Sequence, residues 1–346
     1  MRAVVYDAVG APPQVRQVPR PVCPPDGVLV AVAATGVCRS DWHAWRGHDP
    51  VSLPHVPGHE LAGTVAEVGP QVTRFALGDR VTTPFVNGCG RCEVCAAGNP
   101  QVCPDQSQPG FTGPGSFAEL VALHAADLNL VRLPDTVGFV EAAALGCRFA
   151  TAYRALTVHA RLQPGEWLAV HGCGGVGLSA VVIGAALGAR VVAVDLSASA
   201  LDRARSCGAE AVVRSADPVA EVLELTGGGA HVSVDAFGSA ATAVASIQNL
   251  RRRGRHVQVG LLLDPAGTAL PMDRVVAHEL ELYGSHGMAA ADYPAMLELV
   301  TSGAVRLETL IGSVISLDEA PAALMAMDRL DAVAAGITVI DLLPPA

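Results

Sequence analysis

The sequence predicts an α/β protein with two domains, a β-rich domain and a doubly wound domain built on a parallel sheet. The 346 residues exceed what a single hydrophobic core usually serves. Up to about residue 130, short β-branched runs are separated by Pro and Gly turns, which is typical of a β-rich domain. From about residue 148, strands alternate with Ala-rich helical stretches, which indicates a parallel sheet covered by helices.

The β-rich domain is expected over residues 1–147, and the chain is expected to return to it over residues 288–346. The elements expected in it are strands at residues 27–32, 63–68 and 79–82 and helices near residues 293–302 and 317–329. The returning segment is distinguished from the preceding parallel-sheet domain because its sequence no longer alternates between strands and helices.

The parallel-sheet domain is expected over residues 148–287. Its first unit is a strand at 166–171, a glycine turn, a helix at 176–187 and a strand at 190–195. Further strands are expected at residues 211–213, 231–235, 256–260 and 280–284, which gives a sheet of six strands. The basic run Arg251 to Arg255 is interpreted as a solvated turn before one of these strands.

Composition narrows the class of function. The formal charge of −10 argues against nucleic acid as a partner, because phosphate binding needs a basic surface. All 23 basic residues are arginine, so chemistry through a lysine Schiff base is excluded. The first residues do not resemble a signal peptide, and no apolar run reaches the length of a membrane span, so a cytoplasmic protein without membrane contact is expected.

A dinucleotide motif lies between the strand at 166–171 and the helix that follows. It reads Gly172-Cys173-Gly174-Gly175-Val176-Gly177 and fits G-x-G-x-x-G. The glycines permit a tight turn, close approach of a pyrophosphate and close packing of the helix, whose amino terminus faces the phosphates. Asp195 follows the next strand, where its carboxylate can bind the adenosine ribose diol and would repel a 2′-phosphate. NAD is therefore favoured over NADP, although Arg203 keeps NADP as an alternative because it could reach the ribose region.

Four cysteines form a second motif, C-x2-C-x2-C-x7-C. They are Cys89, Cys92, Cys95 and Cys103. Four thiolates on a tight loop are a common tetrahedral zinc site, and a site with no open position is structural. The alternatives are four unrelated buried cysteines or an iron–sulfur cluster.

Three further segments, taken with these motifs, resemble the zinc-containing medium-chain dehydrogenase/reductase family, the alcohol dehydrogenases, over essentially the whole chain. The segments are Gly36-Val37-Cys38-Arg39-Ser40-Asp41-Trp42-His43, Pro57-Gly58-His59-Glu60 and Leu145-Gly146-Cys147. The resemblance implies a GroES-like catalytic domain joined to a Rossmann domain, two zinc ions per subunit, and a homo-oligomer, either dimer or tetramer.

Within this resemblance, Cys38, His59 and Cys147 hold the catalytic zinc. Two thiolates and one imidazole leave the fourth coordination position open for water or substrate. Taken singly, each of these residues is more often a core or surface residue than a ligand. Glu60 corresponds either to a family carboxylate that approaches the zinc when substrate is absent or to a group that supports the ligands, and both interpretations stay open.

The implied reaction is reversible hydride transfer between NAD and a small-molecule primary or secondary alcohol, with an aldehyde or ketone as the other partner. Zinc lowers the pKa of a bound hydroxyl, so that an alcohol loses its proton near neutral pH. By family analogy Ser40 takes that proton and His43 relays it towards solvent, for which the pKa of histidine is suitable. The alternatives are a turn serine and a surface histidine.

The resemblance assigns four further positions. Arg39 can contact the cofactor pyrophosphate, and Thr151 lies beside the nicotinamide. Trp45 and Phe85 belong to stretches that line the substrate pocket, which favours an apolar or aromatic alcohol, although either could be ordinary core. The chain departs from the family at Arg148, where many relatives carry a small residue, and in lacking the lysine that often supports the adenosine ribose.

Two other functions compete with this interpretation. A zinc-independent quinone or enoyl reductase of the same superfamily would not need both sets of zinc ligands together. A non-catalytic binding or structural protein would need a broken active site, and the sequence shows none. Cys23, Cys173 and Cys207 fit no motif and are expected to be packing thiols.

Overall fold

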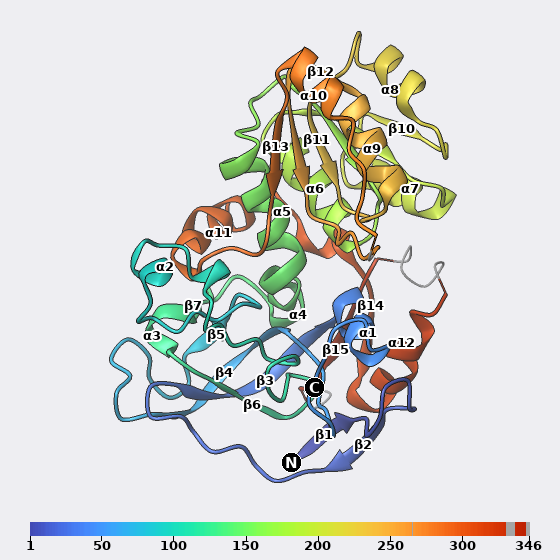
Figure 1. Ribbon diagram of the computed structural model, residues 1–346. Helices are drawn as coiled ribbons and strands as arrows, with labels where there is room; N and C mark the ends of the chain where they lie inside the picture. The colour runs from blue at the N-terminus through green and yellow to red at the C-terminus, as the bar shows by residue number, and fades with distance from the viewer. Residues whose placement is uncertain (265, 330–335, 344–346) are drawn as a thin grey trace.

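A computed structural model describes residues 1–264, 266–329 and 336–343. Figure 1 shows two units, one above the other, each built on its own sheet. Counted over these ranges, the lower unit has a seven-stranded, mainly antiparallel sheet and the upper unit a six-stranded parallel sheet. In the same ranges, no helix is both long enough and apolar enough to cross a membrane.

The lower sheet joins the two ends of the sequence. Its strands are β3 (Val28–Val37), β4 (Glu60–Val68), β5 (Arg80–Thr82), β6 (Leu120–Leu123), β7 (Val131–Arg132), β14 (Ile311–Ser316) and β15 (Ile337–Asp341). The order is β14-β15-β3-β4-β5-β7, and β6 also pairs with β3. A separate two-stranded sheet pairs β1 (Arg2–Val5) with β2 (Gln14–Gln17). Because β15 pairs with β3, the returning segment completes the sheet from which the site is built.

Short helices surround the lower sheet. They are α1 (Arg39–Trp45), α2 (Glu93–Ala96), α3 (Ala126–Asn129), α4 (Phe139–Ala143), α5 (Ala150–Arg154), α11 (Tyr293–Thr301) and α12 (Ala320–Ala326). Tighter or wider turns extend them at η1 (Pro100–Val102), η2 (Leu145–Phe149), η3 (Ala155–His159), η4 (Ala290–Asp292), η5 (Leu307–Leu310) and η6 (Leu317–Glu319). The helix expected near 317–329 is therefore η6 followed by the shorter α12.

The upper unit is the predicted doubly wound sheet, with strand order β10-β9-β8-β11-β12-β13. Its elements are β8 (Trp167–His171), α6 (Gly175–Ala186), β9 (Arg190–Val194), α7 (Ala198–Ser206), β10 (Ala211–Val213), α8 (Val219–Leu225), β11 (Ala230–Asp235), α9 (Ala240–Gln248), β12 (Leu250–Gln258), α10 (Met272–His278) and β13 (Glu281–Gly284). All six expected strands are present and all pair in parallel.

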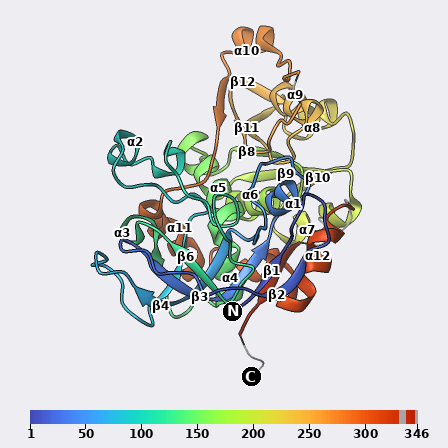
Figure 2. The same ribbon diagram turned by 60° about the horizontal axis from the view of Figure 1, so that its bottom comes forward.

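Both faces of this sheet are buried, as a parallel sheet requires. On β8, Leu168 and Val170 point into a core shared with α6, while Trp167 and Ala169 point into the opposite core, which contains Ile247 of α9. The first core continues into the lower unit through α4 and η2. Figure 2 shows α5 beside α6 at this junction, so the two units share one hydrophobic core at their boundary.

The expectation of a solvated turn at Arg251 to Arg255 was wrong, because these residues lie within β12. The charges lie in the first part of the strand, where the guanidinium groups donate hydrogen bonds to neighbouring carbonyl and carboxylate oxygens. Arg251 donates to the carbonyl of Gly229 at 2.8 Å, and Arg255 donates to the carboxylate of Glu166 at 2.5 Å. Arginine stems can lie along a sheet while their charged ends stay paired, which composition alone does not reveal.

Candidate metal and cofactor site

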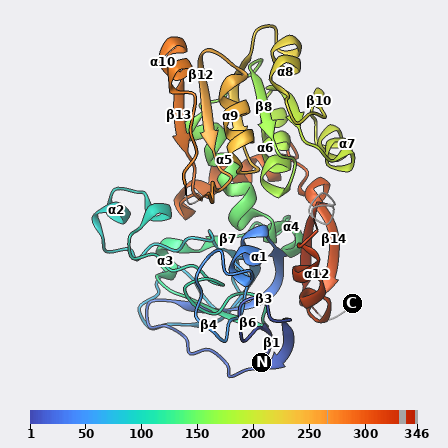
Figure 3. The ribbon, with the colours of Figure 1, turned by 45° about the vertical axis from the view of Figure 1, so that its right-hand side comes forward.

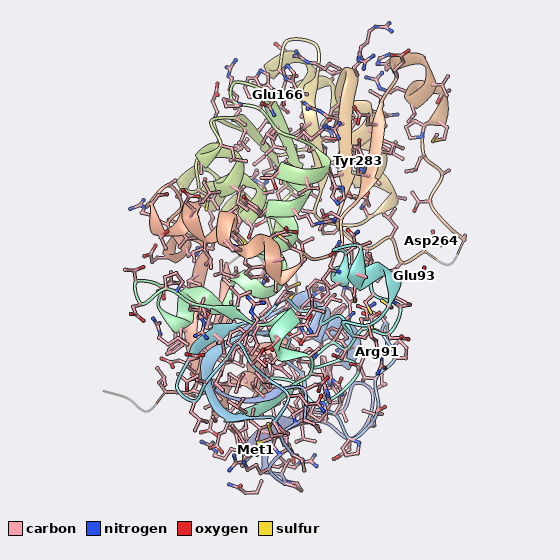
Figure 4. All side chains as sticks on the ribbon, turned by 90° about the vertical axis from the view of Figure 1, so that its left-hand side faces the viewer. Met1, Arg91, Glu93, Glu166, Asp264 and Tyr283 are labelled. Carbon is pink, nitrogen blue, oxygen red and sulfur yellow. The ribbon has the colours of Figure 1, made fainter. Side chains whose placement is uncertain are left out.

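Four cysteines gather on a lobe at the edge of the lower unit. Cys89, Cys92, Cys95 and Cys103, here called the outer cluster, have Sγ atoms that all lie within 4.8 Å of one another. Cys92 caps α2 and Cys95 lies within it, so a single helical turn aims both thiols at one point. Figure 3 shows the lobe around α2 projecting from the molecule, and Figure 4 labels Arg91 and Glu93 on it at the periphery.

Backbone groups of the lobe already point at its sulfur atoms. The amide of Cys89 donates to Sγ of Cys103, and the amide of Cys95 donates to Sγ of Cys92, both at 3.4 Å. A backbone hydrogen bond from Arg91 lowers the pKa of Cys89 to about 7. Buried Asn129 exchanges two hydrogen bonds of 2.9 Å with the backbone of Gly88 and thereby fixes the base of the loop. This donor set fits a tetrahedral ion held by four thiolates.

A second set of ligands comes together from three distant segments. Cys38, His59, Glu60 and Cys147, here called the inner cluster, each offer one ligand atom, and these atoms lie within 4.8 Å of one another. Cys38 follows the last residue of β3 and His59 precedes the first residue of β4. Because Gly36 pairs with Glu60 in the antiparallel register, these two ends meet. The η2 turn adds Cys147, since the carbonyl of Gly146 accepts a hydrogen bond of 2.9 Å from the amide of Phe85.

The orientation of His59 is the clearest sign of a ligand. Its Nδ1 lies 2.9 Å from Oδ1 of Asp41, and both side chains are fully buried. Asp41 also accepts the amides of Cys38 and Gly58 at 3.0 Å. The other ring nitrogen, Nε2, is buried without any hydrogen-bond partner in the structure. A buried nitrogen of this kind costs free energy unless something else binds it, and an imidazole whose Nδ1 is anchored by a carboxylate is the usual form of a metal-binding histidine.

The two thiols of the inner cluster are unequal. The hydrogen bond with Cys147 lowers the pKa of Cys38 well below its ordinary value, and the same contact raises the pKa of Cys147. Burial lowers the pKa of His59, but the charge and the hydrogen bond of Asp41 outweigh burial and raise it well above its ordinary value. A metal ion would displace the protons of Cys147 and His59, because thiolate and neutral imidazole are the ligand forms. The donor set fits zinc with one open position.

Glu60 is bound by Arg148, the residue after Cys147. The backbone amide and Nε of Arg148 donate to Oε1 of Glu60 at 3.1 and 2.9 Å, and Nη2 pairs with Oε2. Burial raises the pKa of Glu60, and the charge of Arg148 opposes that shift. Burial also lowers the pKa of Arg148, but the carboxylate of Glu60 outweighs it and raises the pKa above its ordinary value. Both groups are therefore held as an ion pair beside the inner cluster.

The glycine turn has the geometry that dinucleotide binding requires. Gly172 adopts φ of +87°, and a Cβ added to Gly177 would lie 1.7 Å from the carbonyl oxygen of Gly172. Gly174 caps α6, with Gly175, Val176 and Gly177 in its first turn. The carboxylate of Asp195 closes the turn by accepting the amides of Cys173 at 2.7 Å and Ser197 at 2.8 Å.

The predicted proton-relay residues lie on α1, directly after Cys38. The hydroxyl of Ser40 is 3.9 Å from Sγ of Cys38. Nδ1 of His43 lies 2.9 Å from Nδ1 of exposed His48. Burial, followed by the charges of Arg39 and His48, lowers the pKa of His43, so its ring is neutral at neutral pH. Arg39 stacks 3.5 Å above the ring of Trp42 and donates to the carbonyl of Met327.

The remaining predicted cofactor residues have partners of their own. Thr151 is buried on α5, and its carbonyl oxygen lies 3.4 Å from the hydroxyl of Ser285. Arg203 donates to the carbonyl oxygens of Thr309 and Ile311 at 3.1 and 3.4 Å. Its guanidinium is thus engaged by the returning segment, and its contribution to NADP binding stays a prediction.

Aromatic rings lie beside His59. The ring of Phe111 is 5.2 Å from the imidazole and that of Phe85 is 6.1 Å away, while His286 packs 5.1 Å from Phe85. Trp45 is different, because it is buried with Tyr6 and Leu324 and therefore belongs to the core. Its predicted place in the substrate pocket has no support in this packing.

Sequence reasoning missed several neighbours of the site, namely Asp41, His48, Phe111 and His286. Asp41 carried a usable signal, because it stands three residues after Cys38, where an acidic side chain reaches back to the amide of a helix cap. His48 follows the end of α1 by three residues, whereas Phe111 and His286 come close only through the fold.

Comparison with known protein families and proteins gives a consistent result. Residues 24–135 match the model of the alcohol dehydrogenase GroES-like domain, and residues 175–302 match that of the zinc-binding dehydrogenase domain. An alcohol dehydrogenase from Geobacillus stearothermophilus is 37% identical over 310 residues, which cover 88% of this chain and 90% of that protein.

Two solved structures are similar over nearly the full chain. An alcohol dehydrogenase from Thermus sp. ATN1 superposes with a TM-score of 0.91 at 30% identity, covering 99% of this chain and 100% of that one. A structure described as an NAD-dependent alcohol dehydrogenase gives a TM-score of 0.87 at 31% identity, with the same coverage.

Proposed function

The chain belongs to the zinc-containing alcohol dehydrogenases of the medium-chain dehydrogenase/reductase family, and on that premise we propose that its inner cluster is the catalytic metal site. It is an alcohol oxidoreductase that uses zinc and NAD(H), and its substrates are small alcohols and the corresponding carbonyl compounds. Cys38, His59 and Cys147 hold the inner zinc ion, and the outer cluster holds a second, structural one. The observation that carries the first assignment is the unpartnered Nε2 of His59, buried beside two thiols.

When bound, zinc supplies a Lewis acid that lowers the pKa of an alcohol hydroxyl, and NAD supplies the hydride acceptor. Asp41 keeps the proton of His59 on Nδ1, so that Nε2 presents its lone pair. Ser40 would accept the alcohol proton on its hydroxyl oxygen and release its own hydroxyl proton towards His43. His43, neutral at neutral pH, takes the proton onwards, and exposed His48 passes it to solvent.

The glycine turn binds the cofactor, and we propose NAD rather than NADP. Asp195 is fixed at the end of β9 by two backbone amides, so its carboxylate stays where a 2′-phosphate would be repelled. Gly172, Gly174, Gly175, Val176 and Gly177 leave the backbone open to the pyrophosphate. By family analogy, Arg39 would contact the pyrophosphate and Thr151 would lie beside the nicotinamide.

Two features of the substrate and the assembly follow from the same premise. Phe85 and Phe111 beside His59 favour an apolar or aromatic primary or secondary alcohol. A homo-oligomer forms through the upper unit. Its strand β13 is an edge strand, which pairs with β12 on one side and leaves its other side open in the described sheet.

Metal analysis combined with a substrate panel tests the proposal. Purified protein should contain two zinc ions per chain and reduce NAD faster than NADP with alcohols from primary, secondary, aromatic and polyol classes. Cys38→Ser should lose turnover while its circular dichroism stays unchanged. Unchanged turnover in that variant would refute the catalytic assignment, and protein that reduces carbonyl compounds without any zinc would support the zinc-independent reductase instead.

A further inference from the structure

The ion pair between Arg148 and Glu60 is almost completely removed from solvent. The side chain of Glu60 is fully buried and that of Arg148 is 8% exposed. Three donors of Arg148 meet the two oxygens of one carboxylate, and Nη1 donates to the carbonyl of Val37 at 3.2 Å. A bidentate arrangement of this kind fixes both partners in direction as well as distance.

The pair touches each of the three segments that supply the metal ligands. Val37 precedes Cys38, Glu60 follows His59, and Arg148 follows Cys147. One guanidinium therefore links the end of β3, the start of β4 and the η2 turn, each one residue from a ligand. This position allows Arg148 to act on the geometry of the metal site without contacting the metal.

Two glycines make room for the pair. A Cβ on Gly36 would lie 2.3 Å from Oε2 of Glu60 and 2.8 Å from Nη2 of Arg148. A Cβ on Gly175 would lie 2.4 Å from Cδ of Arg148. Gly36 belongs to the segment of Cys38, and Gly175 opens the helix of the dinucleotide turn. Arg148 therefore fills the space between the metal ligands and the cofactor turn.

Charge balance explains what the pair does for the site. Two thiolates neutralise a divalent ion, and Arg148 neutralises Glu60 separately. Without Arg148, a buried and unpaired carboxylate would lie within 4.8 Å of the other ligand atoms. A buried charge without a partner is strongly unfavourable, and the nearest cation would then be the metal itself.

Resting on the proposed function, we propose that Arg148 is a positioning residue that holds Glu60 out of the coordination shell of the inner metal and so keeps its fourth position open. Glu60 is accordingly a support of the site in the resting protein rather than a fourth ligand. In this chain, the open fourth position depends on that ion pair.

Cobalt in place of zinc tests this without measuring turnover, because its visible spectrum reports the coordination of the inner site. Imidazole, added as a small external ligand, should change the spectrum of the parent protein. In Arg148→Met, Glu60 should occupy the open position, so that half-saturation needs at least about tenfold more imidazole, the scale of effect known for groups that support metal ligands. The double variant Arg148→Met, Glu60→Gln should return to the parent value, since an amide is a weaker ligand.

The outcomes separate the two proposals. If the parent binds cobalt at the outer cluster alone, the catalytic assignment of the inner cluster fails. If the parent responds to imidazole and Arg148→Met responds at the same concentration, only the role of Arg148 is overturned. Arg148→Lys keeps the positive charge but cannot make the two guanidinium hydrogen bonds to Glu60. It replaces Arg148→Met in the test if the methionine variant does not fold. A raised imidazole requirement there supports the proposal, and an unchanged one overturns it.

Discussion

The outer and inner clusters hold their ligands in opposite ways. Outer-cluster cysteines lie within 15 positions of sequence, on a projecting lobe, and two of the four are partly exposed. The inner ligands are spread from Cys38 to Cys147 and converge because β3, β4 and η2 pack together. Backbone amides point at sulfur in the outer cluster, whereas Asp41 and Arg148 organise the inner one.

This difference indicates what each site can do. Four thiolates on one loop would saturate a tetrahedral ion, so a metal bound there would only hold the loop in shape. Three ligands on separate segments leave a position free, but they depend on the whole fold and on side chains outside the ligand set. The contrast leads to three predictions.

The largest expected effect comes from the same substitution made in each cluster. Cys147→Ser should lower kcat/KM by about 10³-fold or more, because the Lewis acid contributes several kcal/mol to the transition state. Cys103→Ser should leave kcat per folded molecule within about tenfold of the parent while lowering the midpoint of thermal unfolding, because a structural metal contributes folding free energy. Steady-state kinetics and calorimetry measure both, and equal losses of kcat/KM in the two variants would remove the distinction.

A smaller effect is expected from Asp41, which anchors His59. Asp41→Asn should weaken zinc binding at the inner cluster by about 10- to 100-fold. A neutral amide accepts the Nδ1 proton of His59 more weakly than a carboxylate does, so the imidazole is a poorer metal ligand. Competition with a chromophoric chelator measures this affinity, and the outer cluster should be unaffected. Asp127→Asn is a control for the inner cluster, since Asp127 also accepts two backbone amides, neither of them from an inner-cluster residue. Equal zinc affinity in the two variants would contradict the anchoring role.

The smallest expected effect is a loss of folding stability at low pH, which tests whether the inner cluster depends on the whole fold. Burial, followed by the charge of His256, lowers the pKa of His171 in the upper unit to about 3. The unfolded chain, with a histidine pKa of about 6.5, binds a proton that the folded chain does not. This contribution to stability is therefore complete above about pH 6.5 and falls by about 1.4 kcal/mol per pH unit towards pH 3.

His171→Gln should remove that part of the pH dependence, which urea unfolding at pH 7.5, 6 and 5 measures. Because η2 shares a hydrophobic core with α6, acid should release the inner metal together with this unfolding. A variant with the same slope as the parent would show that His171 titrates normally in the folded protein.

Sequence reasoning predicted those parts of the molecule that depend on local spacing. The strand–turn–helix around Gly172 and all six parallel strands followed from periodicity and glycine positions. The cysteines of the outer cluster lie together as their spacing implied. For Cys38, His59 and Cys147, family resemblance was needed, because no local pattern connects residues so far apart.

The rest depends on packing that a single sequence does not encode locally. The pairing of Arg148 with Glu60 requires the register of β3 and β4 and two glycines that leave space. Trp45 is a core residue because Tyr6 and Leu324 surround it, and both lie far from it in sequence. Phe111 approaches His59 from a loop with no secondary-structure signal.

The pairing of β15 with β3 has a consequence for biosynthesis. Residues 34–37 next to Cys38 find their strand partner at residues 338–341, so a ribosome emits the entire upper unit before that partner exists. Domains generally fold as units as they emerge from the ribosome, and this edge of β3 stays unpaired until β15 has been synthesised. Newly made chains should therefore complete the upper unit first, and the lower sheet beside Cys38 last.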